Sequence, residues 1–252
     1  MRKKLLVGGD SFSDQQCLSY QGTDIVTWPV LLAKRLDMDL VCLAQSGAGN
    51  EQIYSSIQDY VCKNNPENIG MVMAAWSKAE RLDYELNSPH SYKGPGRSWH
   101  NTRVSPRGEL YHFIRKSIRN FYNLQMLCEA HDLPYKQFQM ISLFKDYISE
   151  YHAHAAEETR AACIKYINES PQFFHIDKGN FIGWPIYDEA GGFVVGDVTV
   201  HQKWRKFQKL AHNNPARPLF KNVPEDYIIS PEDGHPNKAG HELIMEFIYE
   251  DL

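Results

Sequence analysis

The stretch that decides the fold is Leu5-Leu6-Val7-Gly8-Gly9-Asp10-Ser11-Phe12-Ser13-Asp14. An apolar run that ends in two glycines, an acid and a serine is typical of a buried strand that enters a tight turn. Glycine lets the backbone turn sharply and lets other groups approach closely. A serine just past the carboxyl end of a strand stands where open α/β sheets bind their ligands. We therefore expect Ser11 to lie at the carboxyl edge of a parallel sheet.

A histidine block at the other end of the chain gives this serine a candidate base. It reads Pro231-Glu232-Asp233-Gly234-His235-Pro236-Asn237. A serine hydroxyl is a weak nucleophile that needs a base within hydrogen-bond reach, and the base needs an orienting partner. His235 is the candidate base, and Glu232 and Asp233 are both candidates for the acid. We favour Asp233, because its short side chain precedes the flexible Gly234.

Strand and helix signals alternate along the chain. Apolar runs predict five strands, at 5–9, 39–44, 70–75, 134–141 and 173–176. Helical periodicity and capping signals predict helices that begin near Trp28, Asn50, Ser105 and Asn237, with one or two more within 143–168. This alternation predicts an α/β fold, in which a five-stranded parallel sheet in the flavodoxin-like order carries helices on both faces.

The 252 residues are expected to form one domain, 1–252, with two insertions. The first covers about 79–104, of which 83–104 is expected to be a long loop over the site because it follows a strand end and shows no periodicity. The second covers about 177–230 and is expected to be irregular, with a small hairpin within 192–200.

Composition argues against several classes of function. The net charge of −4 gives no field that would attract nucleic acid or an anionic membrane. The five cysteines are scattered without a C-x-x-C pair, so we expect free thiols and no metal site. The apolar run near the N-terminus is too short for a secretory signal, which predicts a cytoplasmic protein. The composition does not indicate an oligomeric state.

A turn of small residues, Gln45-Ser46-Gly47-Ala48-Gly49-Asn50, joins the second strand to the next helix. Backbone N–H groups at such a turn point outward at a helix N-terminus, where they bind anions or the oxyanion of a reaction. Gly49 and Asn50 are the candidate donors. Asn50 is also expected to cap the helix with its side chain.

On these three blocks the chain resembles the SGNH, or GDSL, hydrolases. The matching residues are Gly9-Asp10-Ser11, the turn from Gly47 to Asn50, and Asp233-Gly234-His235-Pro236. Their order matches the family, and the resemblance spans essentially the whole chain. It implies a three-layer α/β/α sandwich and hydrolysis of esters, often acetyl groups on carbohydrate, by an acyl-serine route without a metal or other cofactor. The last block and the segment 183–192 are more similar to phage-encoded members, which implies virion association if the chain is phage-encoded.

The chain departs from the family pattern after the third strand. The family block Gly-x-Asn-Asp is replaced by Ala75-Trp76-Ser77-Lys78, so the asparagine that contributes to the oxyanion hole is missing. Ser77, Lys78 or a loop residue are the candidate replacements. The family acid stands three residues before the histidine, which is Glu232 here, so the resemblance leaves the choice between Glu232 and Asp233 open.

Two hypotheses about function follow. The first is an SGNH-type serine esterase that removes a small acyl group, such as acetyl, from a carbohydrate or another polar ester. Ser11 attacks, His235 is the base, Asp233 or Glu232 orients it, and the oxyanion is held by Ser11 N–H, Gly49, Asn50 and Ser77. The alternative is a catalytically weak or inactive binding or structural protein on the same fold, such as a virion component or a glycan-recognition module. The missing third block favours this alternative.

Overall fold

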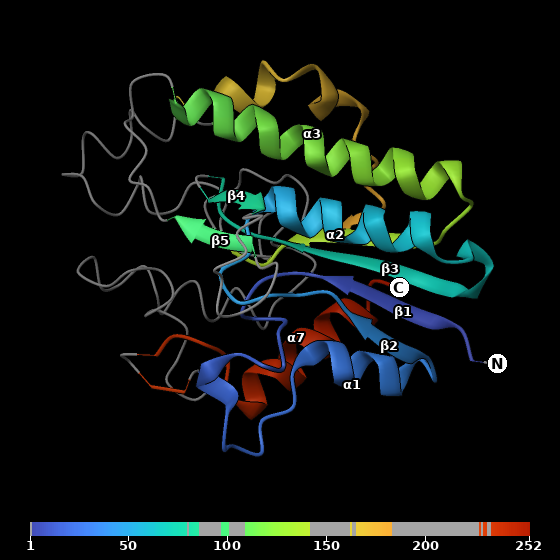
Figure 1. The fold of residues 1–252 in the computed structure, drawn as a ribbon, viewed down its shortest axis with the longest axis vertical. Coiled ribbons are helices and arrows are strands. Elements are labelled where there is room, and N and C mark those ends of the chain that lie inside the picture. Colours follow the sequence, from blue (N-terminus) through green and yellow to red (C-terminus); the bar gives the residue numbers. More distant parts are fainter. Residues whose placement is uncertain are drawn as a thin grey trace.

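The computed structural model describes residues 2–79, 81–85, 97–100, 109–141, 162, 165–182, 227, 229–230 and 233–252. A five-stranded parallel sheet runs through the middle of this part of the chain (Figure 1). Its strands are β1 Lys4–Gly8, β2 Asp39–Cys42, β3 Ile69–Trp76, β6 Tyr135–Gln139 and β7 Phe181–Ile182. Their spatial order is β2-β1-β3-β6-β7, with every neighbouring pair parallel. This confirms the predicted α/β class and the flavodoxin-like order.

Helices cover both faces of the sheet. Helices α2 (Asn50–Lys63) and α3 (Glu109–Ala130) lie over one face, and α1 (Trp28–Arg35) and α7 (Lys238–Tyr249) lie over the other (Figure 1). The three-layer α/β/α arrangement implied by the family resemblance is therefore present.

Alternate side chains of β1 divide between two apolar cores. Leu6 packs into the core beneath α2 and α3, whereas Leu5 and Val7 pack into the core beneath α1 and α7. All three side chains are fully buried, because successive residues of a strand point to opposite faces and both faces are covered. Since neither face of β1 meets water, its sequence is a continuous apolar run that delivers the following turn to one edge of the sheet.

The fifth strand lies elsewhere than predicted. Residues Pro171–His175 form a 3₁₀ helix, and the strand is β7, which begins at Phe181 and pairs with β6. Within the apolar run, Phe173 and Ile176 are buried while Phe174 is 70% exposed. This spacing of three residues follows the 3₁₀ turn, and a short apolar run does not by itself distinguish the two structures.

The predicted long loop over 83–104 is also partly wrong, because it contains an antiparallel hairpin. Strand β4 (Leu82–Glu85) pairs with β5 (Arg97–His100), with Leu82 opposite His100. The alternation Leu-Asp-Tyr-Glu across β4 was the available signal for a strand. The hairpin lies beside the N-terminus of α2, toward the end of the molecule where the sheet strands finish (Figure 1).

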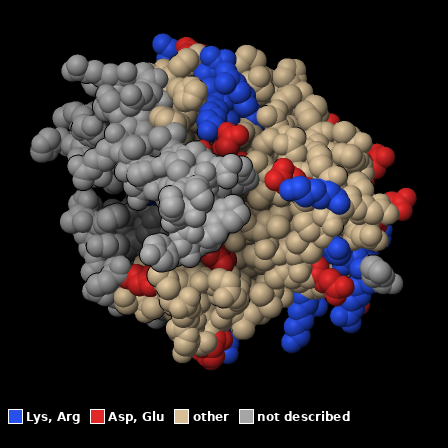
Figure 2. All heavy atoms as spheres, viewed as in Figure 1, with Lys and Arg blue, Asp and Glu red and all other residues tan. Residues whose placement is uncertain are grey.

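Several other expectations fall on residues that the structure does not describe. These are the helix start at Ser105, nearly all of the predicted helices within 143–168, and the hairpin within 192–200. Among the described helices, none is long and apolar enough to cross a membrane. Acidic and basic side chains are interspersed over the described part of the face shown in Figure 2.

His241 joins α7 to the start of α1. Its side chain is fully buried, its Nδ1 accepts a hydrogen bond from Trp28 N at 3.3 Å, and its ring meets Tyr20 edge-on at 5.1 Å. Burial lowers the pKa of His241 to about 3. The folded protein therefore keeps this imidazole neutral at pH values where the unfolded chain protonates it.

This difference predicts that stability falls as the pH drops from about 6.5 toward 3. Between pH 6.5 and 4.5, His241 should account for a loss of about 2–3 kcal/mol in the free energy of unfolding, since each pH unit is worth about 1.4 kcal/mol. Urea unfolding of His241→Gln at pH 6.5 and pH 4.5 measures this effect. The difference in the free energy of unfolding between the two pH values should be about 2–3 kcal/mol smaller in the variant than in wild type. The exposed control His131→Gln should keep the wild-type pH dependence, and equal pH dependence in all three proteins would contradict the prediction.

Candidate functional site

Ser11 lies in a tight turn directly after β1. The turn is closed by a hydrogen bond from Ser13 N to Asp10 O at 2.9 Å, and the Ser11 residue is 9% exposed. Gly9 is required here because a Cβ atom would stand 2.5 Å from Ser13 Oγ. The Gly9 carbonyl accepts a hydrogen bond from Gln45 N, which ties this turn to the one after β2. The predicted nucleophile is thus held at the carboxyl edge of the sheet.

His235 is oriented by Asp233. Asp233 Oδ1 lies 2.5 Å from His235 Nδ1 and also accepts the His235 backbone N–H at 3.1 Å. Because a carboxylate accepts at Nδ1, that nitrogen carries the proton of the neutral ring, in which Nε2 presents a lone pair. His235 Nε2 is buried, and no described residue offers it a hydrogen bond. Of the two candidate acids, Asp233 has this geometry, whereas Glu232 lies outside the described residues.

Ser19 supports the same pair from a distant part of the chain. It belongs to a short 3₁₀ helix (Leu18–Tyr20), and its Oγ lies 3.2 Å from His235 Nδ1. Burial raises the pKa of Asp233, but hydrogen bonds from Ser19 and His235 outweigh it, so the pKa lies below the ordinary aspartate value. Asp233 therefore remains ionised at neutral pH and can stabilise a protonated His235.

Two aromatic rings place His235 against the nucleophile turn. The ring of Phe12, the residue after Ser11, lies 5.0 Å from the His235 ring, and Tyr20 meets it edge-on at 5.9 Å. Among the hydrogen bonds of the described residues, none joins Ser11 Oγ to His235 Nε2. The structure thus brings the predicted nucleophile and base into one cluster without linking them directly.

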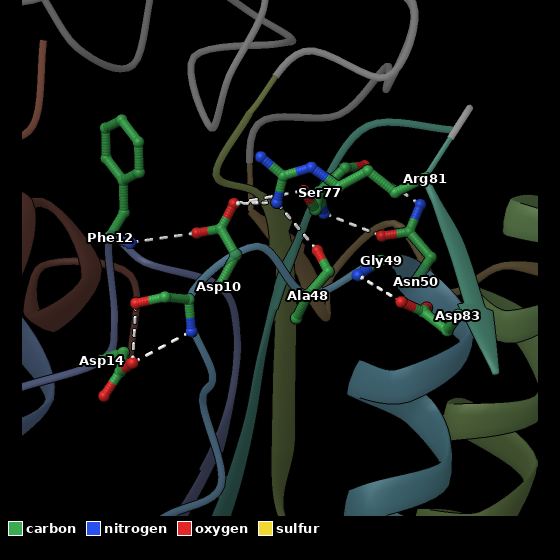
Figure 3. A network of polar contacts seen from close by, with 10 residues as sticks. Asp10, Phe12, Asp14, Ala48, Gly49, Asn50, Ser77, Arg81 and Asp83 are labelled. Carbon is green, nitrogen blue, oxygen red and sulfur yellow. Dashed lines mark hydrogen bonds and ion pairs between the residues drawn. The ribbon is translucent and has the colours of Figure 1, made fainter. Parts of the chain in front are cut away.

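Asp10, the first residue of this turn, binds the turn to neighbouring segments. Its carboxylate is fully buried and accepts hydrogen bonds from Phe12 N at 3.1 Å, Ser77 Oγ at 3.1 Å and Arg81 Nη1 at 3.0 Å (Figure 3). The same Arg81 nitrogen donates to Ala48 O at 2.9 Å. The Ser77 hydroxyl, predicted to face an oxyanion, is instead used to satisfy a buried charge.

Asn50 also has a different task from the predicted one. Gly49 is the N-cap residue of α2, and Asn50 is the first residue within the helix. Asn50 Oδ1 accepts Ser77 N at 2.7 Å, while its Nδ2 donates to Ser77 O and to Ser117 Oγ, each at 3.0 Å. The prediction that Asn50 caps the helix is therefore wrong. Its buried amide instead pairs with the backbone that leaves β3, where every polar atom needs a partner.

The Gly49 N–H, the predicted second oxyanion donor, is bound to a carboxylate of the hairpin. It donates to Asp83 Oδ1 at 3.0 Å, and Gln52 N donates to Asp83 Oδ2 at 2.9 Å (Figure 3). No sequence motif marks Asp83 or Arg81. Their spacing of two residues on either side of Leu82 was a signal that both could point to one side of a strand.

A metal centre has no evident ligands in this site. Within the described part of the chain, no three His, Cys, Asp or Glu side chains cluster closely enough to hold a metal ion.

Comparisons with known proteins give a structural match only. No protein-family model matches the chain, and no curated protein matches it. A solved lipase from a goat rumen metagenome superposes with a TM-score of 0.51 at 10% identity, over 99% of this chain and 97% of that one. A protein from Desulfitobacterium hafniense described as lipolytic and of the G-D-S-L family gives 0.47 at 15% identity, over 99% of both chains. A protein from Slackia heliotrinireducens described as an SGNH hydrolase gives 0.47 at 11% identity, over 100% and 99%.

The chain has the fold of the superposed goat rumen lipase, with a five-stranded parallel sheet between two layers of helices. Within it, the turn after β1 carries Ser11, the turn after β2 carries Gly49, and the loop before α7 carries His235. After β3, Ser77 and Arg81 both bind Asp10.

The buried Asp10–Arg81 pair predicts a large loss of stability when one partner is removed. Arg81→Met leaves the fully buried Asp10 carboxylate without its counter-charge, which typically costs about 3–5 kcal/mol. The control Arg2→Met breaks the exposed pair with Asp37 and should cost less than about 1 kcal/mol. Urea unfolding measures both changes.

Replacing both partners supplies a further check. The double variant Asp10→Asn with Arg81→Met removes both charges, so it should recover part of the stability lost by Arg81→Met alone. A loss for Arg81→Met no larger than that for Arg2→Met would show that the pair does not anchor the turn.

Proposed function

We propose that this protein is a serine ester hydrolase with Ser11 as its nucleophile. The observation that carries the proposal is the Asp233–His235 pair at 2.5 Å, whose Nε2 has no described partner and whose ring rests on the residue next to Ser11. A base oriented in this way beside a serine is the arrangement that activates a hydroxyl for acyl transfer.

The reaction would proceed in two halves. Ser11 Oγ attacks the ester carbonyl carbon while His235 Nε2 takes the hydroxyl proton, and the protonated His235 is stabilised by Asp233. The intermediate collapses as His235 returns the proton to the leaving alcohol, which gives an acyl-serine. His235 then takes a proton from a water molecule as the water oxygen attacks the acyl carbonyl. When the bond between the acyl carbon and Ser11 Oγ breaks, His235 gives this proton to Ser11 Oγ, which releases the acid and regenerates the free serine. The Ser11 backbone N–H is the first candidate donor to the oxyanion.

We further propose that the acyl group is small, such as acetyl, and that the alcohol is a carbohydrate or another polar molecule. Two observations support a small acyl group. Ser11 is only 9% exposed, and the rings of Phe12 and Tyr20 flank the base. The polar alcohol rests on the resemblance to the family. The superposed goat rumen protein is named a lipase, which supports ester hydrolysis on this fold. The name does not indicate which ester this chain would cleave.

A second candidate is a binding protein on the same fold with little or no catalysis. It is favoured by one specific finding: Gly49 N–H, the Asn50 amide and the Ser77 hydroxyl each have an internal partner. In that case the carboxyl edge of the sheet would bind a glycan or a virion partner without cleaving it.

A fluorophosphonate probe distinguishes the two candidates, because it reacts only with an activated serine. Wild-type protein should be labelled at Ser11, as located by peptide mass spectrometry, and Ser11→Ala should abolish labelling. The control Ser55→Ala, on α2, should label like wild type. Absence of label in folded wild-type protein would sink the hydrolase proposal and leave the binding protein.

The orienting acid can be assigned by hydrolysis of 4-nitrophenyl acetate. Asp233→Asn should lower kcat by about 10³-fold or more, because the amide no longer holds Nδ1–H and stabilises no imidazolium. Glu232→Gln is the matched control and should retain near-wild-type kcat. The opposite ranking would show that the acid three residues before His235 is the functional one.

A further inference from the structure

The β4–β5 hairpin follows the position of the third family block. Residues at its start bind the turn after β1 and the turn after β2. Arg81 Nη1 bridges Asp10 and Ala48 O, and Asp83 accepts the backbone N–H groups of Gly49 and Gln52 (Figure 3). Residues 81 and 83 are separated by the two-residue repeat of a strand. Figure 3 shows both side chains directed toward the turn after β2.

The Asp83 carboxylate resembles the negatively charged oxygen of the tetrahedral intermediate, with which it would compete for backbone N–H groups. A carboxylate carries a negative charge shared by two oxygens, and here each oxygen accepts one backbone N–H, at 3.0 and 2.9 Å. Backbone N–H groups at this position would otherwise be available to a developing oxyanion. An N–H that already donates to an ionised carboxylate gains little from a second acceptor.

The fit of Asp83 depends on the residue beneath it. A Cβ atom on Gly49 would lie 2.5 Å from Asp83 Oδ2, 2.9 Å from Asp83 Oδ1 and 2.9 Å from Arg81 Cβ, so both residues approach as closely as they do because position 49 is a glycine. Gly49 has φ −92° and ψ 175°, which an alanine adopts without strain. An alanine at this position would therefore push away both the Asp83 carboxylate and the base of the Arg81 side chain, while the backbone N–H remains. Asp83→Ala, which leaves Arg81 in place, isolates the effect of the carboxylate.

We propose that Asp83 is an internal occupant of the oxyanion position and must withdraw from Gly49 N–H before Ser11 can react efficiently. The inference rests on the proposed ester hydrolysis. The Asp10–Arg81 pair stays as the anchor of the hairpin, and the Asp83 side chain, two residues along, is the part that releases. The contact keeps the basal reactivity of Ser11 low, and displacement of Asp83 by a substrate raises it.

Two variants remove the contact in different ways. Asp83→Ala deletes the carboxylate, and Gly49→Ala displaces it with the charge retained. Both should raise the second-order rate constant for fluorophosphonate labelling of Ser11 by about 10- to 100-fold, since one oxyanion donor is typically worth about 100-fold or more. Asp59→Asn, which neutralises an exposed carboxylate on α2, is the matched control and should leave the rate unchanged. Thermal unfolding of each variant verifies that it is folded.

The outcomes separate the inference from the function on which it rests. If the folded variants label no faster than Asp59→Asn while wild type is labelled, hydrolysis stands and the role of Asp83 is refuted. If neither the wild type nor any variant is labelled, the proposed ester hydrolysis is refuted. Titration with sodium acetate, followed by amide NMR, then tests whether Asp83 occupies an anion-binding position at Gly49 and Gln52. Acetate should then shift the Gly49 and Gln52 amide resonances in Asp83→Ala but not in wild type, and no shift in either protein overturns the proposal.

Discussion

The buried charge of Asp10 is the constraint on which the site depends. A carboxylate with no exposed surface is tolerable only when it is paired and hydrogen-bonded, and Asp10 obtains its partners from its own turn and from the segment after β3. Phe12 N comes from the turn after β1 and Ser77 from the turn after β3, while Arg81 also binds Ala48 in the turn after β2. The turn after β1 and the segment after β3 cannot separate without unpairing this charge, and Arg81 links the turn after β2 to both.

The residues proposed for catalysis are held at the carboxyl edge of the sheet by two kinds of contact, one local in sequence and one tertiary. The base and its acid form a local unit, since Asp233 and His235 are two residues apart and one turn is enough to bring them together. The nucleophile joins them through tertiary packing, in which the His235 ring lies on Phe12. Ser19 completes the unit from the loop that follows the nucleophile turn. This division explains why an oriented base is present although Ser11 and His235 share no hydrogen bond among the described residues.

The segment after β3 that leads into the β4–β5 hairpin is where the site differs from the family pattern. Where the family resemblance implies an asparagine that faces the oxyanion, this chain has an arginine that secures the nucleophile turn and an aspartate that covers the Gly49 N–H. In the proposed hydrolase, Arg81 orders the turn that carries the nucleophile, whereas Asp83 occupies a candidate oxyanion donor, so the two residues have opposite effects on the proposed reactivity of Ser11.

The sequence alone determined the parallel sheet covered on both faces and the turn after β1 that holds Ser11, because continuous apolar runs and glycines at close approaches are local signals. It restricted the acid beside His235 to Asp233 or Glu232, and the structure shows the Asp233 contact. It misplaced the fifth strand, since a four-residue apolar run suits a 3₁₀ turn as well as a strand. Only the tertiary structure decided the partners of Gly49, Asn50 and Ser77. Those polar groups could each have faced a ligand. In the folded chain Gly49 N–H bonds Asp83, the Asn50 amide bonds the Ser77 backbone, and the Ser77 hydroxyl bonds Asp10 instead.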